Sequence, residues 1–128
     1  MDDAPSILIA EDDQAFSYIL AATLESRGWR TIQARTGLEV LRAAREARPS
    51  LVLMDVNLAE SNGVVLADLL KDRLKGVPVL LMSALPEDDL RAKMAEAGAI
   101  DVLPKPFSLS RLVKRVERLL TQKAPADA

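Results

Sequence analysis

The chain has 128 residues, of which 49% are hydrophobic and 28% are charged, and its formal net charge is −2. This length and composition are typical of one globular domain with a sizeable core, and the net charge argues against direct nucleic-acid binding. The chain has no cysteine and no histidine, which excludes disulfides, thiolate metal sites, a histidine general base and a phosphohistidine within the chain.

The sequence has no feature typical of a membrane or secretory protein. It contains no apolar stretch long enough to span a bilayer, and its polar start, MDDAPS, is unlike a signal peptide. We therefore expect a cytoplasmic protein without a membrane partner.

Short apolar runs that are typical of strands alternate with longer stretches whose apolar residues have helical spacing. The predicted strands are residues 7–10, 30–34, 51–54, 77–82 and 101–103. The run at 30–34 alternates polar and apolar residues, which is typical of an edge strand. A helix is predicted after each strand: around 16–24, between Gly37 and Pro49, around 65–70, over 86–98 and over 109–120.

Residues that favour helix ends agree with these predictions. Gly28, Pro49 and Gly98 stand where the first, second and fourth helices should end. The segment SNG at 61–63 predicts a turn before the third helix, and Ser108 is the expected N-cap of the fifth.

Five strand–helix units in succession predict an α/β fold in which helices cover both faces of a parallel sheet. We expect residues 1–123 to form this domain. Residues 124–128 are expected to be a flexible tail or the start of a linker.

Polar side chains follow four of the predicted strands. Glu11, Asp12 and Asp13 come after the first strand and Asp55 after the third, whereas Ser83 follows the fourth and Lys105 the fifth. Ligands of an open parallel sheet bind outside the carboxyl ends of its strands. These side chains are therefore expected to converge on one edge of the sheet.

Neighbouring carboxylates repel one another unless a proton or a cation relieves the repulsion. Glu11, Asp12 and Asp55, with a backbone carbonyl from the loop after Asp55, make an all-oxygen set that suits Mg²⁺. Ser83 could donate a hydrogen bond to an oxyanion bound beside the metal, and Lys105 could neutralise its charge. The set predicts a phosphoryl site in which Asp55 is the nucleophile.

Four segments in this order resemble the receiver domains of two-component response regulators, over nearly the whole chain. They are ILIAEDD at 7–13, LVLMDVNLAESNG at 51–63, VLLMSA at 79–84 and LPKPF at 103–107. The resemblance implies a flavodoxin-like (βα)5 three-layer sandwich with a parallel sheet in the order 2-1-3-4-5. It also implies a signalling domain rather than a separate enzyme.

The resemblance further implies the role of each site residue. Asp55 would accept the phosphoryl group from a sensor histidine kinase or a histidine phosphotransfer protein. Glu11, Asp12 and Asp55 would hold Mg²⁺, with the backbone carbonyl of Asn57. Lys105 would contact the phosphoryl oxygens.

Ser83, with Ala84 after it, would close on the phosphoryl group and carry the switch. The bond between Lys105 and Pro106 would be cis. The downstream partner would be another protein or an output domain missing from this chain, and a homodimer through the fourth and fifth helices is possible.

Three residues depart from the common receiver pattern. Val102 stands where Tyr or Phe is frequent, so an aromatic switch coupled to Ser83 cannot operate in its usual form. Ala59 replaces a common proline, and Ser83 replaces the more frequent threonine while keeping the hydroxyl.

Other interpretations of single residues stay open at this point. Asp13 is expected only to cap the first helix, and Asp55 could be a salt-bridge partner of Lys105. The basic face of the last helix is expected to be solvated, with partner docking as the alternative; it carries Arg111, Lys114, Arg115 and Arg118.

Two other function classes also remain. A receiver-like scaffold that binds partners without phosphorylation is the main alternative. A hydrolase of the haloacid-dehalogenase type needs an acid two residues after the nucleophile, where this chain has Asn57.

Overall fold

The computed structural model describes residues 4–58, 62–86, 88–89, 91–92, 95 and 101–121. Its strands are β1 (Ser6–Ala10), β2 (Arg30–Ala34), β3 (Leu51–Asp55), β4 (Val79–Ser83) and β5 (Asp101–Pro104). Its helices are α1 (Gln14–Glu25), α2 (Gly37–Ala47), α3 (Gly63–Arg73) and α5 (Leu109–Thr121). None of the described helices is long and apolar enough to cross a membrane.

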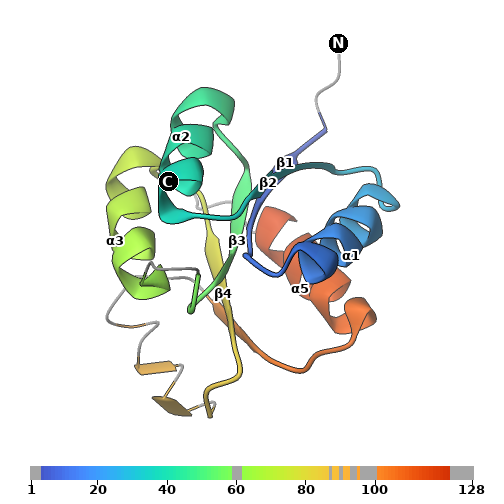
Figure 1. The fold of residues 1–128 in the computed structure, drawn as a ribbon. Coiled ribbons are helices and arrows are strands. Elements are labelled where there is room, and N and C mark those ends of the chain that lie inside the picture. Colours follow the sequence, from blue (N-terminus) through green and yellow to red (C-terminus); the bar gives the residue numbers. More distant parts are fainter. Residues whose placement is uncertain are drawn as a thin grey trace.

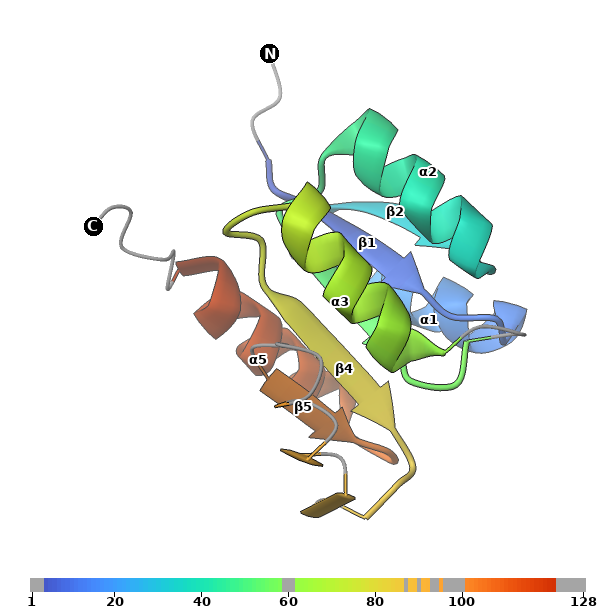
Figure 2. The same ribbon diagram turned by 90° about the vertical axis from the view of Figure 1, so that its left-hand side faces the viewer.

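The five strands form one parallel sheet in the order β2-β1-β3-β4-β5. This confirms the predicted topology and the edge position of residues 30–34. Figure 1 shows α2 and α3 on one side of the sheet and α1 and α5 on the other, and Figure 2 gives the same layers turned by 90°.

Alternating strand residues supply the two apolar layers. Leu8, Val52 and Leu81 point into the core beneath α2 and α3, whereas their neighbours Ile9, Leu53 and Leu80 point into the core beneath α1 and α5. Successive side chains of a strand face opposite sides of a sheet, so a strand covered by helices on both sides needs a continuous apolar run. That requirement explains the full burial of β1, β3 and β4.

Most helix ends agree with the predicted signals, but α1 ends at Glu25, three residues before Gly28, and a turn joins the two. Asp13 caps α1 by accepting a hydrogen bond from the Phe16 backbone N–H, as predicted. Thr36 caps α2 in the same way, so α2 begins at Gly37 itself. Arg48, with a φ of 47°, ends α2 in the left-handed conformation just before Pro49. The Ser108 hydroxyl accepts from the Arg111 N–H at the start of α5, as expected of an N-cap.

Four strand boundaries differ from the prediction by one residue, and the start of β4 differs by two. β4 begins at Val79 rather than at residue 77, because Pro78 has no N–H to donate to a neighbouring strand. β3 extends through Asp55, which pairs in register with Met82 of β4.

The predicted fourth helix lies only partly within the described residues. Residues 88–89, 91–92 and 95 have helical backbone. Gly98, residue 61 of the predicted turn at 61–63 and the tail at 124–128 lie outside the described part of the chain. Most of the fourth helix, through which a homodimer was judged possible, also lies outside it.

Candidate functional site

Two buried carboxylates meet at the carboxyl edge of the sheet. Glu11 directly follows β1 and is 1% exposed, and Asp55 ends β3 and is 7% exposed. The two strands are hydrogen-bonded neighbours, so their ends lie side by side. One oxygen each from Glu11, Asp12 and Asp55 lies within 4.8 Å of the other two.

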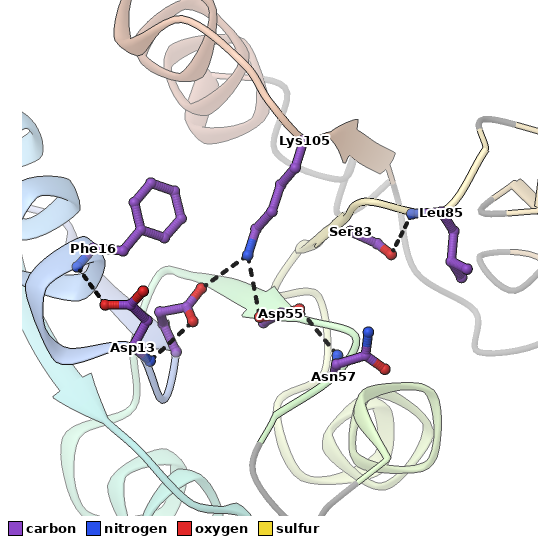
Figure 3. Close-up of polar contacts among 8 residues, drawn as sticks. Asp13, Phe16, Asp55, Asn57, Ser83, Leu85 and Lys105 are labelled. Atoms are coloured by element: carbon purple, nitrogen blue, oxygen red, sulfur yellow. Dashed lines mark hydrogen bonds and ion pairs between the residues drawn. The ribbon is translucent and has the colours of Figure 1, made fainter.

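Lys105 supplies the positive charge at this edge. Its Nζ lies 3.3 Å from Glu11 Oε1 and 3.2 Å from Asp55 Oδ2 (Figure 3). Lys105 directly follows β5, and its backbone N–H donates to the carbonyl of Ser83, at the end of β4. The lysine side chain therefore reaches from β5 across the end of β4 to the acids of β1 and β3.

The charges at the site act on one another's pKa values. Burial raises the pKa of the Glu11 carboxyl and the charge of Asp55 adds to this effect, while the Asp13 N–H and Lys105 oppose it. Burial would lower the pKa of Lys105, but its attraction to Asp55 and Glu11 prevails, and the pKa lies above its ordinary value. The ammonium is therefore charged at neutral pH.

Three side chains at this edge accept a hydrogen bond from the backbone N–H two residues later. The Asp13 N–H donates to Glu11 Oε2 over 3.1 Å, and the Asn57 N–H donates to Asp55 Oδ1 over 3.0 Å. The Leu85 N–H donates to Ser83 Oγ over 3.0 Å. Such local turns fix a side chain against its own loop, so the two carboxylates and the hydroxyl are held in place before any ligand binds.

The hydroxyl of Ser83 is buried with 1% exposure, and Figure 3 shows it turned toward Leu85. Ala84, the next residue, is exposed. Val102 is buried in the core layer beneath α2 and α3, so no aromatic side chain stands at that position to change rotamer. The predicted cis bond between Lys105 and Pro106 is confirmed.

The three carboxylates make a set that fits a hard divalent cation. All of the donor atoms are oxygens, and Mg²⁺ is characteristically held by a few carboxylates together with water. The backbone N–H of Asn57 donates to Asp55, and the Asn57 side chain is exposed. The backbone carbonyl of Asn57 stays the predicted fourth oxygen ligand. Ala59 lies outside the described residues.

Sequence reasoning missed one residue of the site. The expected site does not include Phe16, yet the Lys105 Nζ lies 5.0 Å from the centre of its ring. Phe16 also contacts Phe107, with the two ring centres 5.9 Å apart. The sequence contained one signal for this role. It has only four aromatic residues, and two of them, Phe16 and Phe107, lie near or within the segments that carry the site.

The basic face of α5 corrects another prediction. Arg115 Nη1 lies 2.9 Å from Asp101 Oδ2, and Arg118 Nη2 lies 3.2 Å from the same oxygen. The Arg115 side chain is only 16% exposed, so the expectation of a solvated face was wrong for this residue. A sequence pattern of charges cannot show that the carboxylate of Asp101, at the start of β5, lies opposite the helix.

Comparison with known proteins agrees with this geometry. Residues 7–117 match the response regulator receiver domain family. The chain belongs to that family. Receiver domains are signalling domains of two-component systems, which confirms the resemblance drawn from the four segments.

The relatives of this receiver domain include a protein about twice its length and a protein of about its own length. It is 37% identical to the transcriptional regulatory protein PrrA of Mycobacterium tuberculosis over 94% of its own length, but it spans only about half (52%) of that protein. It is 32% identical to the polar-differentiation response regulator DivK of Brucella anthropi, over 90% of this chain and 95% of DivK.

Solved structures have the same fold. The non-phosphorylated HemR receiver domain of Leptospira biflexa is 32% identical and superposes with a TM-score of 0.82, over 94% of this chain and 98% of that one. A putative response regulator of Chloroflexus aurantiacus is 29% identical with a TM-score of 0.87, over 94% of this receiver domain and all of that chain.

Proposed function

We propose that this receiver domain accepts a phosphoryl group on Asp55 from a phosphohistidine of a sensor histidine kinase or a histidine phosphotransfer protein. The observation that carries this proposal is the shared contact of Lys105 with Glu11 and Asp55. A buried structural ion pair needs one acid and one base. Here a single lysine faces two buried acids with a third, Asp12, beside them.

In the proposed reaction a carboxylate oxygen of Asp55 attacks the phosphorus of the donor. The bond between phosphorus and the histidine nitrogen breaks, a bond between phosphorus and the Asp55 oxygen forms, and the released imidazole nitrogen takes up a proton. Such a transfer depends mainly on positioning and on charge neutralisation. The Asn57 N–H orients the Asp55 carboxylate, and the Lys105 ammonium offsets the negative charge of the incoming group.

Glu11, Asp12, Asp55 and the carbonyl of Asn57 would hold Mg²⁺. The bound ion would supply positive charge to the phosphoryl oxygens. Lys105 contributes one positive charge to the two buried carboxylates that it contacts. This ratio supports a need for further positive charge once a phosphoryl group arrives.

Ser83 would carry the conformational change. In the structure its hydroxyl accepts from the Leu85 N–H. A phosphoryl group on Asp55 would draw the hydroxyl toward its oxygens, and Ala84 and Leu85 would follow. Because Val102 is already buried in an aliphatic core, the response would pass through this backbone turn and not through an aromatic rotamer.

The surface that changes would bind a downstream partner. The greater length of PrrA is compatible with an output domain in the same polypeptide, whereas the match to nearly all of DivK is compatible with a separate partner protein.

The proposed reaction would take place in the cytoplasm. A sensor histidine kinase takes its phosphoryl group from ATP, which is a cytoplasmic nucleotide.

Intact-mass measurement after incubation with acetyl phosphate tests the proposal. We expect one phosphoryl adduct that requires Mg²⁺ and that Asp55→Asn abolishes. Asp68→Asn is the matched control, because Asp68 is an exposed acid on α3. Equal labelling of Asp55→Asn would overturn the assignment. An unlabelled wild type would favour the scaffold alternative, and steady turnover of a phosphomonoester would favour the hydrolase.

A further inference from the structure

The ammonium of Lys105 has an aromatic neighbour as well as two acidic ones. Its Nζ lies 5.0 Å from the centre of the Phe16 ring, and Figure 3 shows the ring beside the end of the lysine side chain. A cation within about 6 Å of the centre of an aromatic face is attracted by the electrons of the ring. The ammonium therefore has three neighbours that stabilise its charge: Glu11, Asp55 and the ring of Phe16.

The position of the Phe16 ring is set from two segments of the chain. Phe16 lies in the first turn of α1, where its backbone N–H donates to the capping carboxylate of Asp13 over 3.1 Å. The ring of Phe107, two residues after Lys105, lies 5.9 Å away at an interplanar angle of 50°. Both rings pack against the core layer beneath α1 and α5. The position of the Phe16 ring therefore does not depend on its contact with Lys105.

A lysine side chain is flexible, and holding it in one geometry has an entropic cost. Two of the contacts that hold Lys105 go to carboxylates. One of these, on Asp55, changes its charge and its neighbours if the residue is phosphorylated. The ring of Phe16 stays the same throughout such a reaction.

We propose that Phe16 is a positioning residue, whose aromatic face holds the Lys105 ammonium over the acceptor site during phosphoryl transfer. This inference rests on the proposed function of Asp55. Phe16 contacts Lys105 and Phe107, so it would act on the acceptor carboxylate through Lys105.

The first test compares initial rates of labelling by acetyl phosphate. Phe16→Leu keeps an apolar side chain but removes the aromatic face, and we expect labelling about three- to tenfold slower. Phe16→Tyr keeps the face and should restore the rate. Tyr18→Leu is the matched control, because it removes a 71% exposed aromatic side chain from the same helix and should leave the rate unchanged.

A double-mutant cycle separates positioning of Lys105 from general packing. If Phe16 acts through the lysine, Phe16→Leu should have no further effect on the labelling rate of Lys105→Met. The same slowing in both backgrounds would overturn the proposal, as would equal rates for wild type and Phe16→Leu. Neither result would question Asp55 as the acceptor.

Nuclear magnetic resonance gives a readout that does not depend on phosphorylation. The ε-CH₂ protons of Lys105 should show a ring-current shift in the unmodified protein, which Phe16→Leu removes and Phe16→Tyr retains. Lys105→Met identifies the signal by its loss. A Lys105 shift that Phe16→Leu leaves unchanged would overturn the proposal even if the protein were never labelled. Failure of the wild type to label would instead count against the proposed function.

Discussion

The Nζ of Lys105 lies 3.2 Å from Oδ2 of Asp55, although the two residues are 50 positions apart in the sequence. The contact joins the loop after β5 to the end of β3, with β4 between the two strands. The contact requires β3, β4 and β5 to lie side by side in this order. The site therefore forms only in the folded protein.

Replacing Lys105 by Met should slow labelling of Asp55 strongly. The substitution keeps an extended apolar side chain and removes the charge that would face the incoming phosphoryl oxygens. Loss of one such stabilising group typically costs about a hundredfold or more in rate. The rate of adduct formation from acetyl phosphate measures the effect. A Lys105→Met protein that labels at the wild-type rate would remove the lysine from the reaction.

Mg²⁺ should stabilise the unmodified protein against unfolding. A ligand at about one hundred times its dissociation constant adds about 2.7 kcal/mol to the free energy of unfolding when it binds only the folded state. Thermal unfolding with increasing Mg²⁺ should show a rising midpoint for wild type. The rise should be smaller for Asp12→Asn and for Glu11→Gln, and unchanged for Asp68→Asn. Equal rises in all four proteins would place the ion elsewhere.

Ser83→Ala should separate phosphorylation from the response to it. The variant keeps Lys105 and the three acids, Asp55 among them, so an adduct should still form. It lacks the hydroxyl that would move to the phosphoryl group, so backbone amide shifts of Ala84 and Leu85 on phosphorylation should be much smaller than in wild type. Ser83→Thr keeps a hydroxyl and should respond as wild type does. Wild-type shifts in Ser83→Ala would exclude the hydroxyl as the switch.

Arg115 should contribute to stability, in contrast to the exposed basic residues of the same helix. Its Nη1 donates to Asp101 Oδ2 and to the carbonyl of Val102. Arg115→Met leaves both acceptors without this partner, so the free energy of unfolding should fall by about 1–3 kcal/mol. Denaturant titration measures this, with Arg111→Met, at an exposed position of α5, as the control. Equal stabilities of the two variants would show that the contact contributes nothing.

Much of the fold follows from local patterns in the sequence. The continuous apolar runs before Glu11 and Asp55 predict strands that are buried on both faces, and the structure confirms both. The start of β4 was predicted two residues early. Hydrophobicity alone does not show that Pro78 has no backbone N–H to donate to a neighbouring strand. Helical spacing also did not distinguish buried Leu66 from exposed Val65 and Leu69, since it identifies a helix more reliably than the limits of its buried stripe.

The candidate site could be predicted as a set of residues but not as a set of contacts. Strand-end positions predicted that Glu11, Asp55 and Lys105 would meet, and they do. The turns that fix Ser83 and Asp55 depend on the backbone path of each loop. The contact of Lys105 with Phe16 depends on how the start of α1 packs against the loop between β5 and α5, where Phe16 contacts Phe107. Neither leaves a pattern in sequence spacing.

The position of the phosphoryl group on the chain distinguishes Asp55 from its acidic neighbours as the acceptor. Borohydride reduces an aspartyl phosphate to homoserine, so peptide mapping of the labelled and reduced protein identifies the modified residue. We expect homoserine at position 55 and at no other aspartate near the site. Homoserine at position 12 or 13, with Asp55 intact, would contradict the assignment of Asp55 as the acceptor.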